Sequence, residues 1–179
     1  MSRTLCVYCG SNDAVPRAYL DLADEVGAGI GARGWTLVWG GSSAAMMGVL
    51  ARAAHRSGAR TIGVIPRALV GLERADQTAD ELVVVETMRE RKAEMDLRSD
   101  AFLALPGGLG TCEELFEVWT SRYLAMHTKP VVLLDPDDHW EGLLRWVREL
   151  GSRGFTDQAA IDALRVTRRV DEALDACAS

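Results

Sequence analysis

The sequence predicts an α/β fold: one three-layer αβα domain around a mainly parallel sheet of about six or seven strands. Short apolar runs alternate along the chain with longer helical patterns, which is typical of βαβ units. The short runs are apolar throughout, as strands buried on both faces require. The 179 residues fit one domain with a full-sized core, so we expect residues 1–179 to form a single domain.

The expected elements follow each other regularly. Strands are predicted at residues 4–8, 36–39, 61–65, 82–85, 101–105 and 131–134. Helical patterns fill roughly residues 17–33, 43–57, 87–99, 111–126 and 139–150, and a weaker strand near 164–167 with a short last helix closes the domain. Residues 66–80 fit no element. Because such a long connection in a compact domain usually serves function, we expect a loop bordering the site.

Composition narrows the class of protein. With 48% apolar residues, 26% charged residues and a net charge of −6, the chain has no basic surface for nucleic acid. It has neither a signal peptide nor a membrane-spanning run, so no membrane partner is expected. We predict a cytoplasmic protein whose four cysteines stay thiols. Cys6 and Cys9, three apart on a strand, would point to opposite faces. The three histidines share no ligand spacing, so no metal site is predicted.

Four loops should meet at one edge of the sheet, because ligands of open parallel sheets bind beyond the carboxyl ends of the strands. These loops are residues 9–12, 39–48, 66–80 and 106–111. Three of them are rich in glycine or serine, which lets backbone amides approach a ligand. Ser11, Gly40 and Gly41 are therefore candidate contacts.

One loop matches only the first half of the glycine pattern found in dinucleotide-binding proteins. It consists of Gly108, Leu109, Gly110 and Thr111. The third glycine is absent and no P-loop motif occurs, so neither a nicotinamide cofactor nor a nucleoside triphosphate is indicated. A nest of amides at a helix N-terminus suits one phosphate group. Cys112 and Glu113, which follow the loop, are further candidate contacts.

Glu114 admits two interpretations. Thr111-x-x-Glu114 matches a capping box, in which the glutamate serves only the helix start. The same geometry aims a carboxylate at whatever the glycine loop binds, where it would act as a base or stabilise a cation. Glu113 lies about 100° away around the helix and is expected to face solvent.

Arg91 lies between Met88 and Met95 on one helix face, so it should point inward. The alternative is a surface arginine that covers the methionines and pairs with Glu94. Lys92 beside it favours an anion site, because two adjacent cations at a cleft call for an anionic partner.

Two motifs carry a family likeness. "MRERKAEM" at 88–95 and "PGGLGTCEE" at 106–114 closely resemble the signatures of the Lonely Guy family, the cytokinin riboside 5′-monophosphate phosphoribohydrolases. The similarity extends to "VYCGS" at 7–11, "WGGSSAAMMG" at 39–48, "GVIPRAL" at 63–69 and "HTKP" at 127–130.

The resemblance implies a Rossmann-like homodimer that needs no cofactor. Such enzymes cleave the N-glycosidic bond of N6-modified adenosine 5′-monophosphates, which releases free cytokinin or adenine and ribose 5-phosphate. The family's catalytic residues fall on Arg91 and Glu114. Its substrate contacts fall on Lys92, on the loop from Gly108 to Thr111, and on Glu73.

The chain departs from the family pattern at three places. Ser42 and Ala45 stand where the family usually has glycine, and Arg89 stands where members often have histidine. The first two changes add bulk near the ligand and bear on substrate preference more than on activity.

Other functions stay open at this stage. A general purine-nucleotide nucleosidase acting on AMP would carry the same motifs, and a non-catalytic nucleotide carrier could share the fold. Relatives have also been labelled lysine decarboxylases. That reaction uses pyridoxal phosphate on a lysine, and Lys92 and Lys129 are the only lysines.

Overall fold

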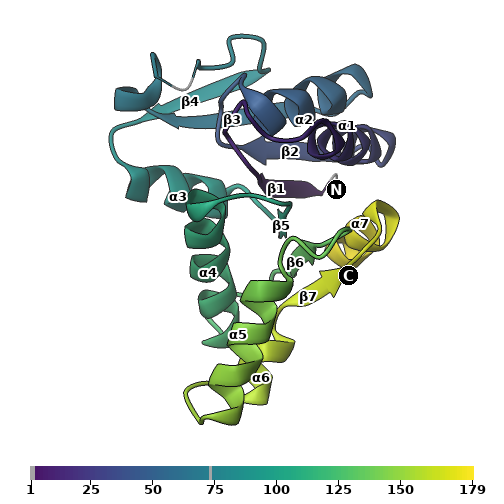
Figure 1. Cartoon of the computed structure of the whole chain (residues 1–179). Coiled ribbons are helices and arrows are strands. Elements are labelled where there is room, and N and C mark those ends of the chain that lie inside the picture. The colour runs from purple at the N-terminus through teal and green to yellow at the C-terminus, as the bar shows by residue number, and fades with distance from the viewer. Residues whose placement is uncertain (1–2, 73) are drawn as a thin grey trace.

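The computed structural model describes residues 3–72 and 74–179 and confirms the α/β prediction (Figure 1). Within these residues, seven strands form one parallel sheet in the order β4-β3-β2-β1-β5-β6-β7. The strands are β1 Thr4–Tyr8, β2 Thr36–Trp39, β3 Thr61–Pro66, β4 Glu81–Val85, β5 Ala101–Ala104, β6 Val131–Leu134 and β7 Arg165–Thr167.

Each predicted helix is present with its ends shifted by a few residues. The helices are α1 Arg17–Ala32, α2 Ala45–Arg56, α3 Met88–Leu97, α4 Leu109–Tyr123, α5 Glu141–Ser152 and α7 Val170–Ala178. The sequence patterns missed α6 Gln158–Asp162, which Asp157 caps by accepting a hydrogen bond from the Ala160 amide at 2.8 Å. None of the helices in the described residues is long and apolar enough to cross a membrane.

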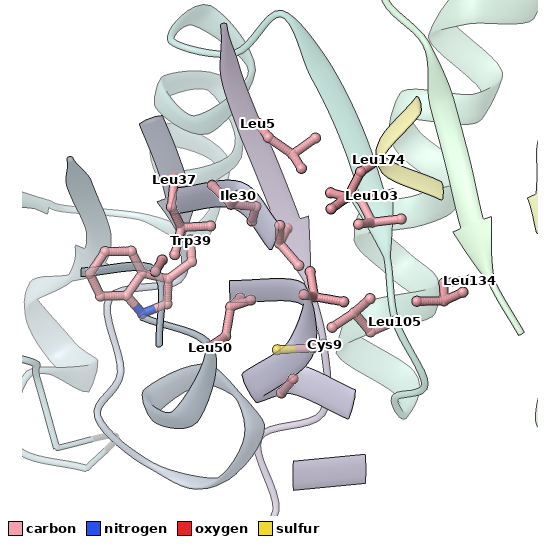
Figure 2. Packing of buried hydrophobic residues seen from close by; sticks show 14 of the residues in the cluster. Leu5, Cys9, Ile30, Leu37, Trp39, Leu50, Leu103, Leu105, Leu134 and Leu174 are labelled. Atoms are coloured by element: carbon pink, nitrogen blue, oxygen red, sulfur yellow. The ribbon is translucent and has the colours of Figure 1, made fainter. Parts of the chain in front are cut away.

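Helices cover both faces of the sheet. On one face, α1, α2 and α7 pack over Leu5, Leu37 and Leu103 (Figure 2). On the other face, α3, α4 and α5 pack over alternate residues of the same strands, among them Cys6 and Phe102. Central strands are buried on both faces, whereas the edge strand β7 is mostly exposed. The prediction of two-sided burial therefore holds for the centre of the sheet.

The two cysteines of the Cys-x-x-Cys spacing lie on opposite faces, as predicted. Cys6 belongs to the core under α3 and α4, and Cys9 to the core under α1 and α2. Burial raises the pKa of both thiols well above the usual range. Neither has the low pKa of a reactive redox cysteine.

The strand order creates a crevice at the centre of the sheet. The chain builds β1 to β4 outward in one direction and then returns to place β5 on the other side of β1. The loops after the neighbouring strands β1 and β5 therefore lead to helices on opposite faces of the sheet, which leaves a crevice between the two loops. Ligands of such sheets bind in this crevice. A hydrogen bond of 3.2 Å from the Gly10 amide to the Pro106 carbonyl joins the two loops.

Residues 66–80 are partly ordered by contacts with the loop after β2. A short 3₁₀ helix, η1 Arg67–Leu69, follows β3 directly. The Ser43 amide then donates to the Arg74 carbonyl at 2.9 Å, and the Asp76 amide donates to the Gly41 carbonyl at 2.8 Å. The segment is thus docked on the loop that carries two of the candidate glycines.

Candidate active site

A cleft of about 460 Å³ lies beyond the carboxyl ends of β1 and β5. The loops at 9–12 and 106–111 line it, together with Met46 and Met47 from the start of α2. Three of the four loops predicted to converge therefore do so. The described residues of 66–80 do not line the cleft, and the segment approaches it through the 2.5 Å ion pair between Arg74 and Asp13.

The glycine loop forms one wall of the cleft, but the predicted capping box is wrong. Helix α4 begins at Leu109, Gly108 is its N-cap residue, and no side chain caps it. Thr111 is the third residue of the helix and is buried against Gly107. A Cβ atom at Gly107 would lie 2.1 Å from the Thr111 hydroxyl oxygen, so this close packing requires glycine. The Thr111 side chain therefore packs against the loop and does not cap the helix.

This arrangement leaves the positive end of α4 at the cleft. The first amides of a helix have no partner within it, and the helix dipole adds to their attraction for an anion. Gly108, Leu109, Gly110 and Thr111 all line the cleft, as predicted for the phosphate cradle. The Leu109 side chain is 88% exposed at the rim.

Glu114 lies one turn further along α4, half-buried, with its side chain lining the cleft. Its negative charge adds to burial in raising the pKa of Cys9, which lines the same cleft. Because Thr111 is not the N-cap, capping does not explain Glu114.

Arg91 points inward from α3, as predicted, and is 5% exposed. Its Nε donates to the Val64 carbonyl at 3.1 Å and its Nη2 to the Gly40 carbonyl at 2.7 Å. Glu94 pairs with Arg98 at 2.5 Å. Arg91 is therefore a buried side chain whose guanidinium plane is fixed where it lines the cleft.

Gly40 and Gly41 do not line the cleft. They belong to the loop whose Gly40 carbonyl accepts a hydrogen bond from Arg91. A Cβ atom at Gly40 would lie 2.1 Å from Arg91 Nη2, so any side chain there would displace the guanidinium. Gly41 has a φ of 73°, in the region that favours glycine. Both residues therefore have a structural role next to the candidate site.

The other predicted contacts divide into two groups. Ser11 lines the cleft, and so does Glu113, whose side chain is 53% exposed. Lys92 and Cys112 do not line it. Cys112 packs against the core under α4, and burial raises its pKa. Glu73 lies outside the described residues.

Lys92 is bound to α4. Its Nζ pairs with Glu113 and, at 2.5 Å, with Glu117. Burial alone lowers the pKa of Lys92, but the hydrogen bonds that it donates to these two carboxylates outweigh burial and raise the pKa. Lys92 therefore ties α3 to α4, the two helices that carry Arg91 and Glu114.

Sequence reasoning missed His139, which lines the cleft opposite α4. Its Nε2 lies 2.9 Å from the Gly107 carbonyl oxygen and 3.3 Å from the Gly107 amide nitrogen. Tyr19 of α1 also lines the cleft and contacts the imidazole ring. The position of His139 in the loop after β6, at the same edge of the sheet as the other loops, was the signal that could have found it.

Several known proteins are similar to this chain in sequence. A family model described as "Possible lysine decarboxylase" matches residues 47–177. A cytokinin riboside 5′-monophosphate phosphoribohydrolase of Mycobacterium marinum is 51% identical over 175 residues, which cover 98% of this chain and 93% of the relative. The Mycobacterium tuberculosis protein of the same name is 50% identical over 175 residues, with the same shares of both chains covered. The protein LOG2 of Arabidopsis thaliana is 40% identical over 158 residues, or 88% of this chain and 74% of that one.

Solved structures show the same fold at lower identity. The molybdenum cofactor carrier protein of Chlamydomonas reinhardtii superposes with a TM-score of 0.75 at 23% identity, covering 98% of this chain and 96% of the other. The molybdenum cofactor binding protein of Rippkaea orientalis superposes with a TM-score of 0.73 at 21% identity, covering 98% and 94%. These two likenesses concern the fold alone.

Proposed function

We propose that this chain, which belongs to the Lonely Guy family of cytokinin riboside 5′-monophosphate phosphoribohydrolases, hydrolyses the N-glycosidic bond of N6-modified adenosine 5′-monophosphates. The products are the free cytokinin base and ribose 5-phosphate. The observation that carries this proposal is that Arg91 of α3 and, from a second part of the chain, the glycine loop with Glu114 line one cleft. The cleft volume of about 460 Å³ lies within the usual range for small-molecule sites.

Each of the three features has a separate role in the hydrolysis of a nucleoside monophosphate. The amides at the start of α4 bind the 5′-phosphate. Breaking the glycosidic bond builds positive charge on the ribose, as in glycoside hydrolysis. The Glu114 carboxylate stabilises that charge and takes a proton from water, whose oxygen bonds to the sugar carbon as the bond to the base breaks. The departing base takes a proton from solvent, and Glu114 returns its proton to solvent.

Arg91 orients the substrate. Its two hydrogen bonds to backbone carbonyls fix the guanidinium before substrate arrives, so little orientational freedom is lost on binding. An arginine fixed in this way can hold a sugar hydroxyl or a phosphate oxygen in one geometry. No step of this reaction needs a metal or an organic cofactor.

The lysines do not suit a decarboxylase. A lysine that forms a Schiff base must lose its proton, yet the pKa of Lys92 is raised by its carboxylate partners. Lys129 donates to the Asp96 carbonyl at 2.6 Å and pairs with its carboxylate at 2.7 Å. We expect no Schiff-base absorption when the protein is incubated with pyridoxal phosphate.

Three further expectations from the resemblance belong to this proposal. We propose that Glu73 contacts the substrate, that the protein is cytoplasmic, and that it is a homodimer. Apolar side chains exposed just after α4 and in the middle of α5 support the dimer: Leu124 at 59%, Met126 at 74% and Trp146 at 50%. Sedimentation equilibrium should give twice the mass of the chain, and the mass of one chain would contradict the dimer.

Product analysis tests the proposed function. The protein is incubated with AMP and, separately, with isopentenyladenosine 5′-monophosphate, and the mixtures are separated by chromatography. We expect free base from both, with faster release from the isopentenyl nucleotide. Intact nucleotides after prolonged incubation would contradict the proposal.

A further inference from the structure

His139 is a polar side chain at the glycine loop to which neither motif assigns a role. It belongs to residues 135–140, which follow β6. This loop is anchored: the buried Asp135 accepts a hydrogen bond from the Trp140 amide at 3.1 Å, and its own amide donates to the Thr167 carbonyl at 2.8 Å. His139 therefore projects from a fixed stretch of backbone.

Two aromatic rings hold the imidazole in place. The Trp140 ring lies 4.7 Å from it, edge to face, and is itself buried in the core. The Tyr19 ring lies 5.7 Å from it, also edge to face, and the Tyr19 hydroxyl donates to Asp137 at 2.7 Å. His139 is exposed, and these contacts give its ring an orientation within the protein itself.

The atom that this orientation presents to the loop is Nε2. Of its two contacts with Gly107, the carbonyl oxygen at 2.9 Å is closer than the amide nitrogen at 3.3 Å. An imidazole nitrogen that carries hydrogen donates to the carbonyl, and one that lacks it accepts from the amide. The hydrogen is assigned here to Nε2, which is the tautomer that fits the 2.9 Å contact.

By holding the Gly107 carbonyl, this hydrogen bond also fixes the direction of the Gly108 amide, which belongs to the same peptide group. The Gly107–Gly108 peptide is trans, so the Gly108 N–H points away from the Gly107 carbonyl. Glycine would otherwise allow this peptide to rotate, because it restricts its own backbone least. Both glycines line the cleft. A hydrogen bond that holds the Gly107 carbonyl in place therefore also sets the direction of the Gly108 amide at the cleft.

We infer that His139 is a positioning residue, which donates from Nε2 to the Gly107 carbonyl and so orients the amides that bind the 5′-phosphate. The inference rests on the proposed function for the identity of the phosphate. It adds a residue on the β6 side of the cleft to a site otherwise built from α3, α4 and the loops after β1 and β5. His139 itself does not touch the reacting atoms.

Binding measurements on His139 variants test this role, because they do not require turnover. The variants are His139→Ala, His139→Asn and His139→Gln, and the probes are ribose 5-phosphate and adenosine, titrated by calorimetry. A glutamine amide reaches about as far as Nε2, whereas an asparagine amide reaches only as far as Nδ1. The matched control is His55→Ala, at an exposed histidine of α2 that lies outside the cleft.

We expect His139→Ala and His139→Asn to weaken ribose 5-phosphate binding roughly three- to tenfold, the effect of one net hydrogen bond. His139→Gln should bind it as the wild type does. Adenosine, which has no phosphate, should bind equally to all variants, and His55→Ala should change neither affinity. Thermal unfolding of each variant checks that the fold is intact.

Three results would overturn the inference: no ribose 5-phosphate binding to the wild type, unchanged binding to His139→Ala, or equal weakening of both probes. A glutamine variant as weak as the alanine variant would also contradict it, because the ring and not the donor would then matter. A wild type that binds ribose 5-phosphate but leaves AMP intact would refute the proposed function and leave this inference standing.

Discussion

Glu114 is the residue on which the chemistry of the cleft depends. Because α4 begins at Leu109, Glu114 is one turn inside the helix, and it lines the cleft. Glu114→Gln keeps the shape and removes the charge. We expect turnover to fall by roughly 10²-fold or more, the scale of a lost acid or base.

Stability should separate this role from a structural one. The free energy of unfolding of Glu114→Gln should change by no more than about 1 kcal/mol, which is the scale of a lost helix cap. Steady-state kinetics and urea unfolding on the same preparation measure both quantities. Near-normal turnover in the folded variant would remove Glu114 from the mechanism.

Arg91 and Arg89 provide a matched pair on one helix. Arg91 is buried and bonded to the Gly40 and Val64 carbonyls, whereas Arg89 is exposed. Lysine lacks the planar fork of arginine, so it cannot keep both bonds and orient a substrate as well. We therefore expect Arg91→Lys to lose most of its activity and Arg89→Lys to lose little.

Measuring kcat/KM for both variants, with thermal unfolding as a check on folding, tests this difference. An equal loss in the two variants would contradict the argument from the face of the helix. Arg91 could be predicted from its spacing with the methionines. Its backbone partners could not, because they come from loops distant in sequence.

At the scale of elements, the start of α2 carries local strain. Its first residue, Ala45, has a φ of 45°, in the left-handed region that costs a residue with a side chain about 1–2 kcal/mol. Ala45 does not line the cleft, so its extra methyl group bears on the backbone and not on the ligand. Ala45→Gly should therefore leave the free energy of unfolding unchanged or raise it by up to ~1 kcal/mol.

Two comparison variants make this test specific. Ala45→Val should destabilise the protein by at least about 1 kcal/mol, because β-branched residues avoid positive φ. Ala93→Gly, at an exposed position inside α3, should cost about 1 kcal/mol, as glycine usually does within a helix. If Ala45→Gly costs as much as Ala93→Gly in urea unfolding, the strain at the start of α2 is absent.

The elements also show where sequence patterns reach their limit. Buried strands were predictable because an apolar run between turns is a local signal. The start of α4 was not, because Thr111 looks like an N-cap until its packing against Gly107 is known. Helix α6 was missed although Asp157 is a good cap, since five residues show too little periodicity. His139 was missed because its contacts are to another loop.

At the scale of the whole molecule, the order of the strands makes the site. Neither the cleft nor the meeting of residues 9–12 with 106–111 follows from alternation of strands and helices alone. They follow from β5 pairing with β1, which brings Gly10 and Pro106 into hydrogen-bond contact. The motifs thus identify the chemistry, and the sheet order explains why they act together.

The molecule as a whole repels anions. With a net charge of −6, it binds a phosphate only where local donors overcome the global field. The amides at the start of α4 and the buried Arg91 provide those donors in one cleft. Charged hydrogen bonds each contribute about 1.5–3 kcal/mol, so a substrate without phosphate should lose several of them.

The ratio of kcat/KM for AMP to that for adenosine therefore tests the account most directly, because the scissile bond is the same in both. We predict a ratio on the order of 10³ in favour of AMP, given a tenfold change per ~1.4 kcal/mol. ATP should also be a poor substrate, because a loop without a P-loop lysine motif has room for one phosphate. Adenine release at comparable rates from AMP and adenosine would show that the glycine loop does not hold the 5′-phosphate, and the site described here would be wrong.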